Sequence, residues 1–184
     1  MKKTILLILT LLGFTLANTG MLTPKEESGM GAWLSYEVAT LDSDVEDFEG
    51  AYNISFDYMT SLGLEVGLNM GHESGNAWKG LELAYHYKSE KWNMALSWAR
   101  QLYDDSNDMD ADVLWFTGYS NSRIYGSLGG WSIDGADFEF ELLKLGKIWT
   151  FETGASLNVL YWSNFSSDAG IDKGILVVEL GYTF

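Results

Sequence analysis

Two histidines are the chain's candidate general bases, and each has carboxylates close by in the sequence. His72 is followed by Glu73 and Ser74 in the segment GHESG, residue types that nucleophilic catalysis uses. Neighbours along a loop do not establish the geometry of a triad, and a polar turn flanked by glycines needs no catalytic role. His86 shares a face of an alternating segment with Glu82, where a hydrogen-bonded interior histidine is the simpler interpretation. We therefore expect no catalytic residue and no enzymatic activity.

The acidic segment DDSNDMDAD, which begins at Asp104, is the candidate metal site. Asp108, Asp110 and Asp112 have the spacing that opens a calcium-binding loop. The glycine and the distal glutamate of such a loop are missing, so the match is incomplete. The segment is interpreted as a solvated loop, and we expect neither a metal site nor a cofactor.

Other charged residues recur on the polar faces of alternating segments, so they would line one interior. Carboxylates confined together need counter-ions, and a water-filled passage lined by them favours cations. Charged pairs would serve equally well to hold a narrow interior closed, so an open and a closed lumen both fit the sequence. The candidate lumen-lining residues are Glu37, Asp57, Glu65, Glu82, His86, Lys88, Glu139, Glu141, Glu152 and Glu179.

The elements that carry these residues alternate apolar and polar side chains with a period of two, which predicts β-strands. About ten such segments follow one another, and none has a helical period. The pattern predicts a strand over 137–143, a turn at KLGK (144–147) and one long strand over 148–162. The segments 112–120 and 123–131 are apolar on both faces in places, so eight strands remain the alternative.

Long and short connections alternate between these segments. Long acidic links such as TLDSDVEDFEG and DDSNDMDAD are separated by short ones such as Thr60-Ser61 and YSNSR, and GHESGNAW is predicted as another long link. Long loops at one end and short turns at the other are typical of a barrel that spans a membrane. Ten strands would also place both ends of the chain at the short-turn end.

The polar faces indicate that the apolar faces point outward. They consist mainly of Gly, Ala, Ser and Asn with scattered carboxylates, whereas a soluble surface carries both signs of charge at higher density. Small residues suit a narrow interior. Aromatic residues near segment ends, and Trp149 and Tyr161 at the ends of one predicted strand, fit the two membrane interfaces. The predicted fold is all-β, a transmembrane antiparallel up-and-down β-barrel of ten strands, with a soluble barrel as the competing interpretation.

The N-terminal residues have the pattern of an export signal. Lys2 and Lys3 precede an apolar run that is too short to span a bilayer, and Thr15-Leu16-Ala17 is a suitable cleavage site. We predict a cleaved signal peptide at 1–17, a periplasmic tail at 18–29 and a barrel at 30–184. The chain has no cysteine, and its formal net charge of −15 argues against nucleic acid as a partner.

The last ten residues, ILVVELGYTF, carry apolar side chains at alternate positions up to a terminal aromatic residue. This segment resembles the C-terminal assembly signal of bacterial outer-membrane β-barrels, a closing strand that ends in phenylalanine. The residues that match are Leu176, Val178, Leu180, Tyr182 and Phe184. The resemblance implies location in the bacterial outer membrane and insertion by the barrel assembly machinery, and it identifies no subfamily.

Three functions fit this barrel. The first is a porin-like passage of small cations or polar solutes through a narrow acidic lumen. The alternatives are a closed structural or surface-interaction barrel with acidic extracellular loops, and a small lipid-modifying enzyme. We expect a monomer whose partners are outer-membrane lipid and lipopolysaccharide, with divalent cations at the acidic loops.

Overall fold

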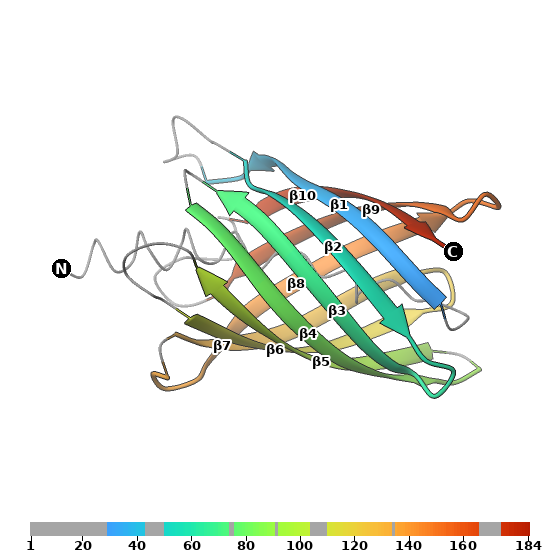
Figure 1. Ribbon diagram of the computed structural model, residues 1–184, viewed down its shortest axis with the longest axis horizontal. Helices are drawn as coiled ribbons and strands as arrows, with labels where there is room; N and C mark the ends of the chain where they lie inside the picture. The colour runs from blue at the N-terminus through green and yellow to red at the C-terminus, as the bar shows by residue number, and fades with distance from the viewer. Residues whose placement is uncertain are drawn as a thin grey trace.

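The computed structural model describes residues 29–42, 50–73, 76–90, 92–103, 110–133, 135–165 and 174–184, which form an all-β barrel (Figure 1). The predicted signal peptide and all but the last residue of the predicted tail lie outside these residues. The ten strands are β1 (Gly29–Thr40), β2 (Tyr52–Met59), β3 (Leu64–Glu73), β4 (Asn76–Lys88), β5 (Trp92–Tyr103), β6 (Asp110–Ser120), β7 (Ile124–Ile133), β8 (Glu139–Thr150), β9 (Ala155–Asn164) and β10 (Ile175–Thr183).

Each strand pairs antiparallel with the next, and β10 pairs with β1, so the sheet is closed. Closure leaves no unpaired strand edge, as a β-structure within hydrocarbon requires. The predicted up-and-down barrel of ten strands is confirmed, and the alternative of eight strands is wrong. The described part of the chain contains no helix that is long and apolar enough to cross a membrane.

The two ends of the barrel have different connections. One end, the short-turn end, carries the start of β1 and the C-terminus (Figure 1), together with the connections 60–63, 89–91, 121–123 and 151–154. The other end, the loop end, carries the connections 41–51, 74–75, 104–109, 134–138 and 165–174. This division matches the predicted layout except at GHESGNAW. There the strands β3 and β4 continue farther than predicted and leave only residues 74–75 between them.

The turns after β2 and after β8 have the same hydrogen bonds. The Gly63 amide donates to the Thr60 carbonyl at 3.0 Å, and the Gly154 amide donates to the Phe151 carbonyl at 3.0 Å. Both glycines have positive φ, 82° and 87°, which an L-residue adopts only with strain. This is the hairpin loop in which a type I turn is followed by a left-handed glycine.

The second of these turns corrects the predicted course of the chain. The predicted turn at 144–147 and the predicted single strand over 148–162 are wrong, because β8 continues to Thr150 and β9 begins at Ala155. Gly146, which suggested the turn, lies within β8 opposite Tyr125, where a Cβ would be 2.5 Å from the tyrosine ring. Trp149 and Tyr161 lie on different strands, so their spacing does not measure the height of the barrel.

The outward face is apolar and the inward face contains most of the buried polar groups. In the hairpin of β2 and β3, the outward Phe56 and Leu68 are 51% and 59% exposed, whereas the inward Ser55 and Asn69 are buried. This arrangement is the reverse of a soluble barrel and is that of a membrane-spanning one. It confirms the predicted direction of the two faces.

Aromatic side chains gather at both rims of the outer face. At the short-turn end the exposed aromatic residues are Tyr58, Tyr87, Trp92, Trp149, Phe151, Tyr182 and Phe184, and at the loop end they are Tyr36, Tyr52, Phe138 and Phe140. The outward residues between these rims are mostly aliphatic. Two aromatic girdles around an apolar band are the pattern expected where a barrel meets both membrane interfaces.

Inside the barrel, four large aromatic residues each pair in register with a glycine. The pairs are Trp33 with Gly181, Trp78 with Gly71, Trp115 with Gly129, and Tyr125 with Gly146. A Cβ on any of these glycines would lie within 2.5 Å of the partner ring, so only glycine gives the ring room to cover the neighbouring strand. The interior glycines are therefore packing positions.

Some tryptophans point toward lipid and others point into the barrel, so the two groups should differ in how strongly lipid with brominated acyl chains quenches their fluorescence. Replacing the exposed Trp92 and Trp149 by phenylalanine is expected to lower the fraction of tryptophan emission that this lipid quenches, because contact with the chains is needed for quenching. Replacing the buried Trp78 and Trp162 is expected to raise that fraction. Equal changes in the two double variants, measured by steady-state fluorescence, would contradict the assignment of faces.

Candidate functional site: the barrel interior

The interior has two unlike walls. The inward side chains of β1 to β4 form a mainly polar wall, whose buried carboxylates are Glu37, Asp57, Glu65 and Glu82. The inward side chains of β5 to β10 form a mainly apolar wall, whose large members are Trp115, Tyr119, Tyr125, Trp131, Leu142, Ile148, Leu160, Trp162, Ile175 and Val177. An acidic surface therefore faces an apolar one across the barrel.

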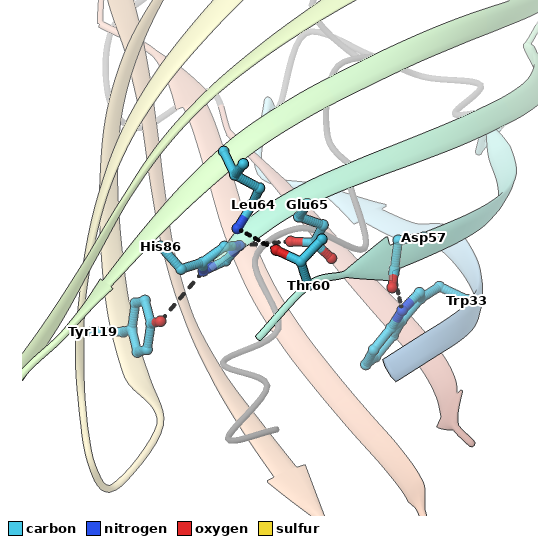
Figure 2. A network of polar contacts seen from close by, with 7 residues as sticks. All are labelled: Trp33, Asp57, Thr60, Leu64, Glu65, His86 and Tyr119. Atoms are coloured by element: carbon cyan, nitrogen blue, oxygen red, sulfur yellow. Dashed lines mark hydrogen bonds and ion pairs between the residues drawn. The ribbon is translucent and has the colours of Figure 1, made fainter. Parts of the chain in front are cut away.

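Two polar contacts anchor the polar wall near the short-turn end (Figure 2). The Trp33 Nε1–H donates to Asp57 Oδ2 at 2.8 Å, and His86 Nε2 lies 2.6 Å from Glu65 Oε2. A carboxylate accepts hydrogen bonds, so the Nε2 of His86 carries the proton in this contact. His86 Nδ1 lies 3.4 Å from the hydroxyl of Tyr119, which belongs to the other wall.

Lys144 of β8 is the buried cation of the interior. Its side chain is 0% exposed, and its ammonium lies 4.1 Å from the ring centroid of Trp115. The ammonium is also near enough to Glu82 and Glu179 to interact electrostatically with both carboxylates. β4 and β8 lie on opposite sides of the barrel, with β5 to β7 between them on one side. The attraction between Lys144 and Glu82 therefore crosses the interior.

Hydrogen bonds position the carboxylate of Glu179, which attracts this lysine. The amide of Asn158 donates to Glu179 Oε2. The same amide lies 3.0 Å from the hydroxyl of Tyr125, which itself donates to Asn158 Oδ1 at 3.2 Å. Three strands, β7, β9 and β10, thus contribute to one buried polar group on the otherwise apolar wall.

Lys144 is the interior residue that sequence analysis missed. The predicted turn at 144–147 placed it outside the strands, although it shares the inward alternation of Leu142, Gly146 and Ile148. The signal that would have identified it lies at the end of β8. The glycine of FETG corresponds to the glycine of TSLG in the first hairpin, and a turn there extends the strand through Lys144.

Of the ten predicted lumen-lining residues, six are buried inside the barrel: Glu37, Asp57, Glu65, Glu82, His86 and Glu179. Glu141 is half-buried, and it accepts hydrogen bonds from Trp131 Nε1 at 2.9 Å and Asn164 Nδ2 at 2.8 Å. Lys88, Glu139 and Glu152 are exposed at the ends of the barrel. The expected inward position of Glu152 within a strand is wrong, because this residue lies in the turn after β8.

The five residues of the predicted assembly signal alternate outward along β10. Leu176 and Val178 are half-buried, whereas Leu180, Tyr182 and Phe184 are exposed on the outer face. β10 pairs with β1 over most of its length, and the amide of Phe184 donates to the Met30 carbonyl at 3.1 Å. The strand that carries this pattern is therefore the one that closes the barrel.

The candidate residues outside the interior show no catalytic or metal-binding arrangement in the part of the chain that the structure describes. His72 lies on the outer face and stacks on Tyr52, with ring centroids 5.7 Å apart. Asp110 and Asp112 pair with Arg100 at 2.8 Å and 3.6 Å. The neighbours Ser74 and 104–109, which completed the two predicted motifs, lie outside the described residues.

The interior is filled by its own side chains. Glu65, Glu82 and Glu179 are each 1% exposed, so water does not reach these carboxylates through the described part of the barrel. Large side chains such as Trp33 and Trp131 are buried in the same interior. Chemically, the arrangement can stabilise a cation inside the barrel and can link its two walls by electrostatic attraction.

The comparison with known proteins gives structural similarities only. No family model and no curated protein matches the chain. Eighteen chains of solved structures match it. One is the outer membrane protein Omp33 of Acinetobacter baumannii, with 8% identity, a TM-score of 0.46, and coverage of 86% of this chain and 99% of that chain. Another is Ail, the attachment invasion locus protein of Yersinia pestis, solved with the heparin analogue sucrose octasulfate, with 12% identity, a TM-score of 0.35 and the same coverage. At these identities the likeness concerns the fold alone.

Proposed function

We propose that this chain is a monomeric, non-enzymatic barrel of the bacterial outer membrane, closed within the membrane and acidic at its outer surface. The exposed apolar band between two aromatic girdles supports the membrane location. The closing strand, with its outward alternation up to Phe184, supports insertion by the barrel assembly machinery. The partners of the outer face would be membrane lipid and lipopolysaccharide.

The observation that carries the closed state is the burial of the charged groups at mid-barrel. A conducting lumen would expose its charged lining to water, yet Lys144, Glu82 and Glu179 are almost completely buried. Ten strands enclose little more space than their inward side chains need. The barrel would therefore act as an anchor that holds its loops at the cell surface.

The loop end differs strongly in charge from the short-turn end. Its connections contain twelve Asp and Glu residues and one Lys, whereas the short turns contain two acidic and two basic residues. Long loops of such barrels are extracellular, so the acidic end would face outward. Basic partners and divalent cations suit this charge, and divalent cations would bridge it to the phosphates of neighbouring lipopolysaccharide.

Passive passage of small cations is the second candidate function. The specific observation in its favour is the excess of buried carboxylates over buried cations, because Glu37, Asp57, Glu65, Glu82 and Glu179 accompany one lysine in the described interior. If water entered, this lining would attract cations and repel anions. The two candidates differ in whether the wild-type barrel conducts.

Planar bilayer recording tests the proposal. The refolded protein, checked for the faster gel migration of an unheated barrel, is expected to insert without producing conductance steps in KCl. A general porin refolded in the same detergent serves as the positive control for insertion and detection. Reproducible cation-selective steps from the wild-type protein would contradict the closed barrel and favour the second candidate.

A further inference from the structure

The buried ammonium of Lys144 lies in surroundings that suit a cation. An aromatic ring face is at 4.1 Å. The buried carboxylates of Glu82 and Glu179, on opposite sides of the barrel, attract the ammonium from beyond hydrogen-bonding distance. Ring faces and carboxylates are the groups that bind ammonium-type cations in water-poor sites. Among the described residues, the Nζ atom has no hydrogen-bond partner. It is therefore held by charge and by the Trp115 ring.

The polar wall continues from this point toward both ends of the barrel. Glu37 lies on the loop side of the wall, and Glu65 and Asp57 lie toward the short-turn end. Between them the wall carries small or polar side chains, among them Ser35, Ser55 and Asn69, beside the larger buried side chains of Trp33, Met59 and Trp78. A row of acidic and small polar groups through the membrane would conduct cations if water filled it. The side chain of Lys144 opposes hydration at the centre of this row, because it occupies space there and its positive charge attracts both carboxylates.

We infer that Lys144 keeps the barrel closed by placing its own ammonium in an internal cation site formed by Trp115, Glu82 and Glu179. This inference rests on the proposed closed barrel and assigns the closure to one residue. Without the ammonium, two carboxylates would remain buried without a nearby cation, which is costly. Water and small cations would enter to compensate, and the polar wall would become a cation-selective path.

The test compares bilayer conductance of Lys144→Ala, Lys144→Met and Lys147→Ala, each checked for folding by gel migration and circular dichroism. Lys144→Ala is expected to produce cation-selective steps where the wild type has none. Lys144→Met keeps most of the bulk without the charge and is also expected to conduct. Lys147→Ala is the matched control and is expected to be silent, because Lys147 lies three residues along β8 on the outer face, over Trp149.

An added amine provides a second readout. Millimolar propylammonium, which replaces the part of the lysine beyond Cβ, is expected to reduce the conductance of Lys144→Ala. Neutral propanol, with nearly the same shape, is expected to leave it unchanged. Equal effects of the two compounds would overturn the cation site.

The other outcomes are also decisive. If Lys144→Ala folds but produces no conductance steps, the role of Lys144 is overturned and the proposed closed barrel stands. If the wild type conducts, the proposed closed barrel itself is contradicted. A silent Lys144→Met beside a conducting Lys144→Ala would assign closure to the bulk of the side chain and overturn the role of its charge.

If neither variant folds, acetylation of the folded wild type tests the inference instead. An N-hydroxysuccinimide ester is the reagent, and mass spectrometry measures the rate at which each lysine reacts. Lys144 should react about tenfold or more slowly than Lys147, because reaction needs an opening of the barrel; equal rates would overturn the inference.

Discussion

Arginine in place of Leu68 is expected to lower the free energy of unfolding in a phospholipid bilayer by about 2–4 kcal/mol, the cost of a lipid-facing arginine near the midplane. Leu68 is 59% exposed at the middle of β3, between Phe56 and Leu81 on the neighbouring strands. If the barrel spans a membrane, a guanidinium at this position must enter hydrocarbon. Denaturant titration of the protein folded in vesicles measures the difference.

Leu62→Arg is the matched control for this substitution. Leu62 is 76% exposed in the turn before β3, where the arginine would reach water at the membrane surface. A change within about 0.5 kcal/mol is expected there, as for most surface substitutions. In a soluble barrel both leucines would already face water, so equally small effects of the two arginines would contradict the membrane location.

Alanine in place of Gly181 is expected to destabilise the barrel by about 1–3 kcal/mol, the usual cost of overpacking a filled interior. The added Cβ would lie 2.0 Å from the indole of Trp33, and the two residues pair directly between β10 and β1. Trp33 is 2% exposed, and its Nε1–H is bonded to Asp57, so the ring has little freedom to move away. Because this pair lies at the closing seam, we also expect less folded protein in the outer membrane.

Gly118→Ala is the control, because a Cβ at this outward glycine would meet nothing within 4 Å. It should be neutral or slightly stabilising, since glycine within a strand costs backbone entropy. In the Trp33→Leu background, Gly181→Ala should lose most of its effect on the unfolding free energy. An undiminished effect in this double-mutant cycle would show that the ring is not the cause.

The two-walled interior relates the stability of the barrel to its closure. Burying carboxylates is unfavourable unless a cation or hydrogen-bond donors compensate. Here the donors are Trp33, His86 and Asn158, and the cation is Lys144. The same groups that compensate the buried carboxylates also occupy the space through which water would pass, so a stable interior and a closed interior have one physical origin.

Much of this fold follows from local pattern in the sequence. A strand exposes alternate residues to opposite faces, so the period-two pattern of segments such as 52–59 fixes both the strand and its lipid-facing side. Small polar residues opposite apolar ones indicate which face is inward. The alternation of long and short connections then fixes the up-and-down order, and the outward residues of β10 identify the closing strand.

The segment 144–154 shows where local pattern fails. Gly146 and Gly154 are equally plausible turn residues in the sequence, but Gly146 is required by the ring of Tyr125 on β7 and Gly154 by a positive φ. The first requirement comes from a different strand, so only the assembled sheet distinguishes the two. The misplaced turn removed Lys144 from the predicted interior and made the lumen appear more acidic than it is.

The sequence by itself determined that the chain forms a closed membrane-type barrel with acidic loops, because alternation and loop length are properties of consecutive residues. Only the tertiary structure decided what fills that barrel. The polar wall, the apolar wall and the buried charge of Lys144 arise from residues on strands that face one another across the interior, as Lys144 on β8 and Glu82 on β4 attract each other. Such arrangements depend on the register and closure of the whole sheet, which no single segment specifies.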